Sequence, residues 1–102
     1  MEFQEYQNAA MRTRLPTADI MYAVLNLAGE AGEVTSKYAK ALRDSTPIDR
    51  EAVALELGDV LWCVALACEE LNIPMSQVAK MNIDKLASRS ARNQLSGSGD
   101  FR

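Results

Sequence analysis

Histidine is absent from this chain of 102 residues, and that absence excludes more chemistry than any other feature of the composition. Without an imidazole group there is no Ser-His-Asp or Cys-His catalytic site, no histidine general base, no usual haem ligand and none of the common zinc sites. Any chemistry must therefore use carboxylates, lysine, arginine and a hard metal ion.

The chain also lacks a basic stripe and a long apolar run. It has 11 Lys and Arg against 14 Asp and Glu, a net charge of −3 that does not favour general nucleic-acid binding. No uncharged apolar segment reaches the roughly eighteen residues of a membrane span. The N-terminal residues lack the apolar stretch of a signal peptide. We therefore expect a cytoplasmic protein with no nucleic-acid and no membrane partner.

The two cysteines lie in one apolar run. Cys63 and Cys68 are five positions apart, which places them on different faces of a helix and disfavours a disulfide between them. We expect both to be small buried hydrophobic residues in a reducing compartment.

Apolar residues recur with a helical period, and no segment alternates with period two. Prolines separate the predicted helices, which cover residues 2–12, 17–44, 46–71 and 75–92. Thr17 or Asp19 can cap the second helix, and we expect Thr46 to cap the third with Pro47 in its first turn.

These elements predict an all-α fold, a bundle of about four helices with two long central helices. Residues 1–92 form the domain, and residues 93–102 form a flexible C-terminal tail. A chain this short buries only about 60–70% of its unfolded surface, so we expect the bundle to be completed by oligomerisation.

Two acidic pairs carry the functional prediction. Glu30 and Glu33 are spaced i, i+3 and project from one side of the second helix, a pattern that by itself also fits a solvated face. In the third helix, residues 52–68 contain only two charges, Glu56 and Asp59, again spaced i, i+3 and lying between two apolar arcs. A helix that is apolar on two sides is buried or contacts another subunit.

Carboxylates in such a setting need a counter-charge. Unpaired buried carboxylates cost several kcal/mol each, and residues 51–79 contain no lysine or arginine. A divalent cation would resolve the repulsion, whereas the alternative is that raised pKa values keep one or two acids protonated. All-oxygen ligation favours Mg²⁺, with Mn²⁺ as its substitute.

Glycine precedes three of the four acids, at Gly29, Gly32 and Gly58. Glycine inside a helix costs about 1 kcal/mol relative to alanine, so we expect the helices to approach each other closely there.

The predicted fourth helix has the opposite charge. Asn82, Lys85 and Arg89 are spaced i, i+3, i+7 and therefore lie on one face of the helix. Such a face can donate hydrogen bonds to the oxygens of a polyphosphate. Alternatively, the basic residues only interact favourably with the helix dipole near the C-terminus. Trp62 points away from the acids, so we expect it at a subunit interface rather than in a pocket of this chain.

The pattern Glu30-Ala-Gly-Glu33, Glu56-Leu-Gly-Asp59 and Asn82-x-x-Lys85-x-x-x-Arg89 resembles the MazG-like, all-α nucleotide pyrophosphohydrolases over residues 3–90. The resemblance implies that Glu30, Glu33, Glu56 and Asp59 ligate Mg²⁺, and that Asn82 and Lys85 hold phosphates. It also implies hydrolysis of a nucleoside triphosphate (NTP or dNTP) to the monophosphate and pyrophosphate. The implied enzyme is a homodimer or homotetramer that removes unwanted nucleotides from the nucleotide pool.

Within this interpretation we assign catalytic roles to Glu33, as general base, and to Lys85, which with Arg89 neutralises the leaving pyrophosphate. Two alternatives remain open. The chain could be a non-catalytic helical module that binds a partner protein through its second apolar face, formed by Leu55, Trp62 and Leu66. It could also be a phosphoribosyl-ATP pyrophosphohydrolase, whose acidic motif is similar.

Overall fold

The computed structural model describes residues 1–93 and 96–100, and this part of the chain contains four helices and no strand. The helices are α1 (Phe3–Met11), α2 (Ile20–Asp44), α3 (Arg50–Leu71) and α4 (Met75–Ala91). The all-α prediction is therefore confirmed, and each predicted helix exists within a few residues of its expected bounds. None of these helices is both long enough and apolar enough to cross a membrane.

Short polar side chains set the helix ends. Asp19 caps α2 by accepting a hydrogen bond from the backbone N–H of Tyr22 at 2.9 Å. The predicted cap at Thr46 is wrong: α3 begins at Arg50, because Asp49 accepts from the backbone N–H of Ala52 at 3.1 Å. Ser45 and Asn72 end α2 and α3 in the left-handed conformation, with φ of 53° and 57°.

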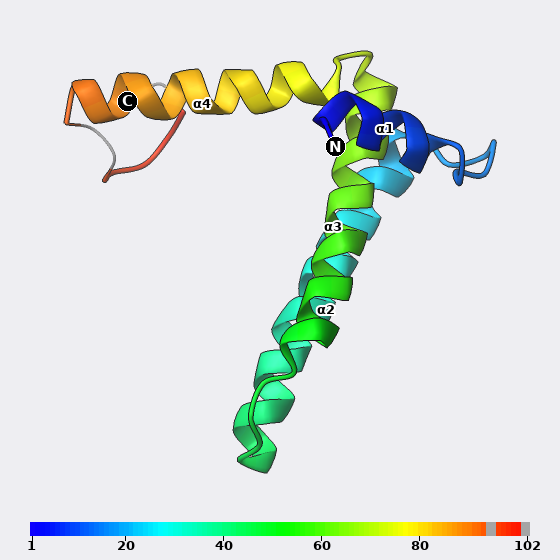
Figure 1. The fold of residues 1–102 in the computed structure, drawn as a ribbon, viewed down its shortest axis with the longest axis vertical. Coiled ribbons are helices and arrows are strands. Elements are labelled where there is room, and N and C mark those ends of the chain that lie inside the picture. The colour runs from blue at the N-terminus through cyan, green and yellow to red at the C-terminus, as the bar shows by residue number, and fades with distance from the viewer. Residues whose placement is uncertain (94–95, 101–102) are drawn as a thin grey trace.

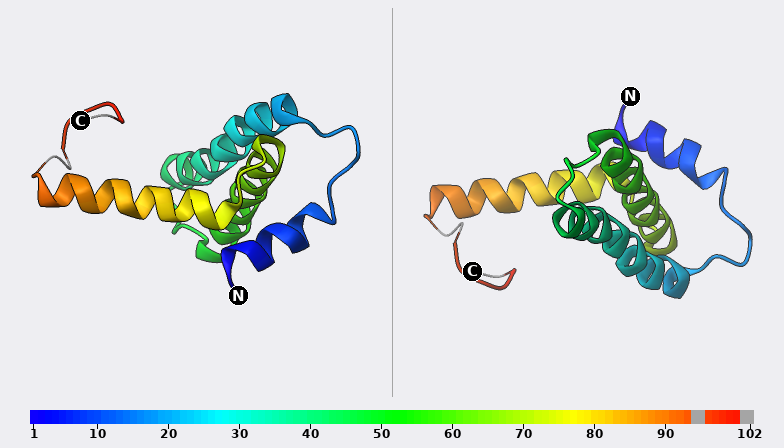
Figure 2. Two further views of the ribbon diagram at one scale, coloured as in Figure 1. Left: turned by 90° about the horizontal axis from the view of Figure 1, so that it is seen from above. Right: turned by 90° about the horizontal axis from the view of Figure 1, so that it is seen from below.

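The two long helices, α2 and α3, form an antiparallel hairpin, and the other two helices pack at one end of it (Figure 1). There α1 lies against α3 and α4, while α4 leaves the hairpin at a steep angle and makes no packing contact with α2 among the described residues (Figure 2). The hairpin and α4 are therefore two separate arms that diverge from one junction.

The core lies at this junction and is small. Buried residues from all four helices and from the loop after α1 form two clusters. One contains Ala10, Ala65, Cys68 and Met75, and the other contains Ala18, Ala23 and Leu66. Met11 and Trp62 pack against both clusters. Cys63 and Cys68 are both free and buried, as expected.

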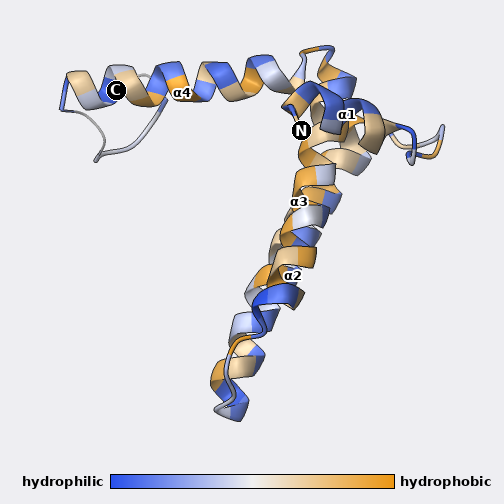
Figure 3. Cartoon of the chain, in the orientation of Figure 1, coloured by the Kyte–Doolittle hydropathy of each residue, from blue (hydrophilic) through white to orange (hydrophobic). Residues whose placement is uncertain are grey.

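Away from the junction, large apolar side chains are exposed on both arms. Hydrophobic residues occur along the ribbon of each arm (Figure 3). Leu55 on the hairpin is 70% exposed, and Ile83 on α4 is 64% exposed. The radius of gyration is 16.3 Å, whereas a compact domain of this size has about 13 Å. The single chain therefore leaves apolar surface that a compact fold would bury.

The tail predicted for residues 93–102 is partly described. Residues 94–95 and 101–102 lie outside the described part, and residues 96–100 follow α4 with Asp100 beside Lys85 and Arg89. The flexibility of this tail and the domain boundaries stay predictions.

Candidate metal centre

Three carboxylates from the two long helices converge in the middle of the hairpin. One oxygen from each of Glu30, Glu56 and Asp59 lies within 4.8 Å of the others, and we call these three residues the acidic cluster. Asp59 is exposed, and Glu30 and Glu56 are half-buried. The expectation that the carboxylates lie in apolar surroundings is thus only partly met, because the other two helices pack at one end of the hairpin and not over its middle (Figure 1).

The register of the hairpin explains why these residues meet. One turn before Glu30, Asn26 donates a hydrogen bond from Nδ2 to Cys63 Sγ at 3.4 Å, and Cys63 lies one turn after Asp59. Because α2 and α3 run in opposite directions, this contact places Glu30 opposite Asp59.

Electrostatic repulsion acts on Glu30 within this cluster. Partial burial raises the pKa of this carboxyl above its usual value, and the neighbouring charges of Asp59, Glu56 and Glu33, in that order, raise it further. Like charges held this close favour a proton or a cation between them.

A lysine that the sequence argument overlooked lies at the edge of the acidic cluster. Lys37 Nζ is 3.9 Å from Glu56 Oε1, so the counter-charge missing from residues 51–79 is supplied in part by α2. Its position, seven residues after Glu30 on the same helix, was the available signal. The Lys37 side chain is 40% exposed and the distance is long for an ion pair, so this charge compensates only a fraction of three carboxylates.

Glu33, the fourth predicted ligand, is exposed one turn along α2 from Glu30. Among the described residues it is not a member of the acidic cluster, although its charge acts on Glu30. Its assignment as ligand and as general base stays a prediction.

The glycines beside the acids do not mark a close approach of helices within this chain. A Cβ atom placed on Gly29, Gly32 or Gly58 would meet nothing within 4 Å among the described atoms outside its own helix. The predicted tight contact is therefore wrong for the hairpin, since these glycines face open space beside the carboxylates.

The predicted phosphate-binding residues lie on the other arm, on α4 (Figure 1). Lys85 Nζ is 3.0 Å from Asp100 Oδ1, and the buried Arg89 donates from Nη2 to Gly99 O at 3.0 Å and to Asp100 Oδ1 at 3.4 Å. Asn82 and Lys85 share a cavity of about 630 Å³ with Asp100. The structure thus groups these residues with one another around an anion, but not with the acidic cluster.

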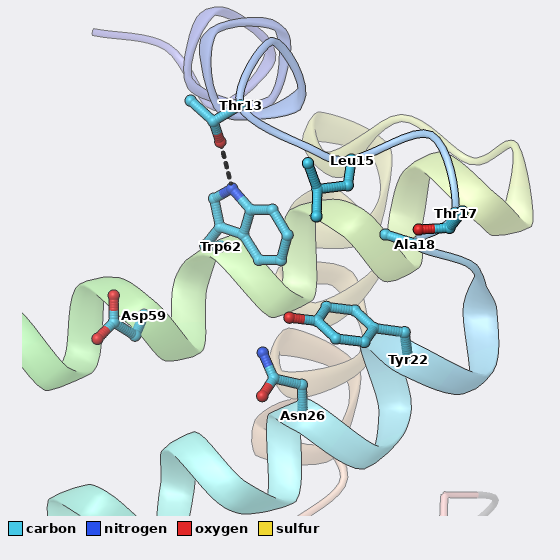
Figure 4. Close-up of a pocket in the computed structure, with 8 residues that line it drawn as sticks. All are labelled: Thr13, Leu15, Thr17, Ala18, Tyr22, Asn26, Asp59 and Trp62. Carbon is cyan, nitrogen blue, oxygen red and sulfur yellow. Dashed lines mark hydrogen bonds between the residues drawn. The ribbon is translucent and has the colours of Figure 1, made fainter.

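A cavity of about 450 Å³ adjoins the acidic cluster at Asp59. The residues that line it come from α2, α3 and the loop between α1 and α2 (Figure 4): Thr13, Leu15, Thr17, Ala18, Tyr22, Asn26, Asp59 and Trp62. The prediction that Trp62 lies outside any pocket of this chain is therefore wrong, whereas its place at a subunit interface stays a prediction. α1 crosses α3 there, and Trp62 packs beneath it with its indole N–H donating to Thr13 Oγ1 at 2.8 Å.

Comparison with known proteins now adds to this geometry. Residues 19–93, which span α2, α3 and α4, match the profile described as the MazG nucleotide pyrophosphohydrolase domain. The chain belongs to this family. The match includes both acidic pairs and the basic face of α4, so the MazG domain accounts for most of the chain and supports a nucleotide pyrophosphohydrolase activity.

A relative among curated proteins has a name that describes no function. The chain is 41% identical over 87 residues to the Gene 37 protein of Mycobacterium phage L5, a match that covers 81% of this chain and 76% of the phage protein. No solved structure is significantly similar to the chain.

The second apolar face predicted for a partner-binding module does not exist as a surface. Leu66 is completely buried and Trp62 is packed under α1, which leaves Leu55 alone exposed among the three residues expected there. The MazG domain therefore presents its apolar surface elsewhere, along the outer parts of the hairpin and of α4 (Figure 3).

Proposed function

We propose that this MazG domain is an enzyme that hydrolyses a nucleoside triphosphate (NTP or dNTP) to the monophosphate and pyrophosphate with Mg²⁺, and thereby removes unwanted nucleotides from the cytoplasmic pool. The observation that carries the proposal is the convergence of Glu30, Glu56 and Asp59 within 4.8 Å from two different helices. Membership of the family supports the reaction class.

The acidic cluster fits a hard divalent cation. Its donors are all carboxylate oxygens, the ligands that Mg²⁺ and Mn²⁺ prefer, and the raised pKa of Glu30 indicates negative charge in excess of what Lys37 offsets. When bound, Mg²⁺ would offset the charge of the triphosphate and lower the pKa of a water molecule. Glu30, Glu56 and Asp59 are the residues we assign to hold it, with Glu33 able to join them.

Proton transfer in the reaction needs a carboxylate that is not fully engaged by metal. Glu33 is exposed and outside the acidic cluster, one turn from Glu30, so we assign it as the general base. A water oxygen forms a bond to the α-phosphorus, the bond from that phosphorus to the bridging oxygen breaks, and Glu33 accepts the water proton.

The leaving pyrophosphate needs positive charge, which we assign to Lys85 and Arg89 with Asn82 as a further donor. These side chains already surround a carboxylate, that of Asp100, which supports their ability to bind an anion. They lie on the arm that diverges from the hairpin, so we propose that they serve the acidic cluster of a second copy in a homodimer or homotetramer. The apolar surface exposed on both arms supports such an assembly.

Substitution of one cluster residue tests the proposal. Glu56→Gln keeps the size of the side chain but removes its charge, so we expect Mg²⁺-dependent pyrophosphate release to fall about a hundredfold or more. Glu51→Gln, an exposed acid in the first turn of the same helix, is the matched control and should retain activity. Undiminished turnover by a folded Glu56→Gln protein would overturn the assignment.

The related phosphoribosyl-ATP pyrophosphohydrolase activity requires a separate test. A panel of NTPs, dNTPs and phosphoribosyl-ATP, scored for pyrophosphate against inorganic phosphate, distinguishes these substrates. We expect pyrophosphate from nucleoside triphosphates, and preferential turnover of phosphoribosyl-ATP would redirect the assignment within the same reaction class.

A further inference from the structure

The cavity beside Asp59 has the chemistry of a site for a flat, uncharged group. Among the described residues, Asp59 is the only charged one that lines it, and no lysine or arginine does. Phosphate groups therefore have no counter-charge inside this cavity, and a planar heterocycle with hydrogen-bonding edges suits it better.

Two aromatic rings face the cavity from different helices. Tyr22 on α2 is 49% exposed, and Trp62 on α3 is half-buried, with both rings directed into the same space (Figure 4). The indole N–H of Trp62 is already occupied, because it donates to Thr13 Oγ1 at 2.8 Å and to Ala10 O at 3.3 Å. Thr13 therefore holds the ring in place, and Trp62 offers its face rather than a hydrogen bond.

Asn26 is a polar residue that lines the same cavity. Its carboxamide uses Nδ2 toward Cys63 Sγ, so its carbonyl oxygen is the part of the group that can accept a further hydrogen bond. The cavity thus combines stacking surface with one acceptor, and at its far end Asp59 belongs to the proposed metal centre.

We propose that this cavity binds the nucleobase of the substrate, stacked against Trp62 and Tyr22, with Asn26 accepting a hydrogen bond from a base N–H. The inference rests on the proposed function and adds that base recognition lies within one chain, even though the phosphate-binding arm comes from another copy. The sugar then passes Asp59, and the α-phosphate reaches the acidic cluster.

The test uses the only tryptophan of the chain, whose emission reports directly on the cavity. A nucleoside monophosphate, added to the full chain without Mg²⁺, is expected to quench Trp62 fluorescence with saturation, because a stacked base quenches indole emission. Ribose 5-phosphate, which has no base, should leave the emission unchanged. Equal effects of the two compounds would overturn the inference.

Matched tyrosine variants locate the effect. We expect Tyr22→Leu to weaken binding about tenfold, the loss that follows from removal of one stacking partner. Tyr38→Leu changes an exposed tyrosine of the same helix that does not line the cavity, and it should bind as the unmodified chain does. Asn26→Ala should reduce the differences in affinity among the four monophosphates, and unchanged binding in both cavity variants would contradict the proposal.

The readout separates failure of this inference from failure of the proposed function. If nucleotides do not quench Trp62 while the chain still releases pyrophosphate, the base lies elsewhere and the enzymatic assignment stands. If monophosphates quench Trp62 but no triphosphate is hydrolysed, the cavity is a nucleotide site without the proposed activity.

Discussion

At the scale of single residues, the acidic cluster shows how little counter-charge the chain itself provides. Lys37 and Glu56 are 3.9 Å apart with side chains 40% and 21% exposed, and pairs of this kind contribute about 0–1 kcal/mol. Glu30 has no cation beside it among the described ion pairs, and its pKa is raised. We therefore expect Glu30 to respond to both metal and protons.

We predict that Glu30 makes metal binding sensitive to pH. Its pKa in the folded chain lies above the ordinary value of 4.5, so the folded state binds more protons than the unfolded state just above that value. The favourable contribution of the protonated carboxyl is fully present below pH 4.5 and is lost as pH rises through the raised pKa. Mg²⁺ must displace this proton, so its stabilising effect should shrink as pH falls through the same range.

Thermal unfolding of the unmodified chain and of Glu30→Gln, with and without Mg²⁺ across that pH range, measures this effect. The substitution should flatten the pH dependence in the absence of metal, and the matched variant Glu5→Gln on α1 should not. Identical pH profiles for the unmodified chain and Glu30→Gln would contradict the role given to this carboxyl.

At the scale of elements, the hairpin of α2 and α3 positions the site. Asn26 against Cys63 fixes the register, and the carboxylates on either side of that contact meet one turn further along. The connection between the helices is short, so the capping residue that begins α3 influences how the chain turns from one helix into the other.

The observed cap of α3 leads to a stability prediction. Asp49→Ala removes the acceptor for the Ala52 N–H and should lower the free energy of unfolding by about 1 kcal/mol. Thr46→Ala should have a much smaller effect, since Thr46 lies outside the helix and is not its cap. Chemical denaturation of the two variants under the same conditions measures both changes. A larger loss in the free energy of unfolding for Thr46→Ala than for Asp49→Ala would contradict the assignment of Asp49 as the cap.

At the scale of the whole molecule, the proposed site is divided between two arms. The acidic cluster lies on the hairpin and the basic face lies on α4, which makes no described packing contact with α2 (Figures 1 and 2). The single chain is more extended than a compact domain of its length, and its apolar residues are exposed along both arms. A symmetric assembly would cover this surface and bring the two halves of the site together.

Mixed assemblies test whether the two halves act between copies. Glu56→Gln and Lys85→Ala should each be nearly inactive alone. When the two variants are unfolded together and refolded, random pairing into dimers leaves one intact site in each mixed dimer and should restore about a quarter of the unmodified activity. No recovery from folded, assembled mixtures would mean that each site is built within one copy.

The sequence alone determined the helices, because their signals are local. The apolar period, the prolines that end helices and the short polar capping residues each depend only on residues close together in the chain. The sequence also singled out the two acidic pairs, since Glu56 and Asp59 are the only charges in residues 52–68, although it did not separate Glu33 from the three acids that converge. Only the tertiary structure decided that Trp62 packs under α1, that Lys37 reaches Glu56 and that α4 diverges from the hairpin. These features depend on how helices far apart in the sequence cross, which no local pattern of side chains specifies.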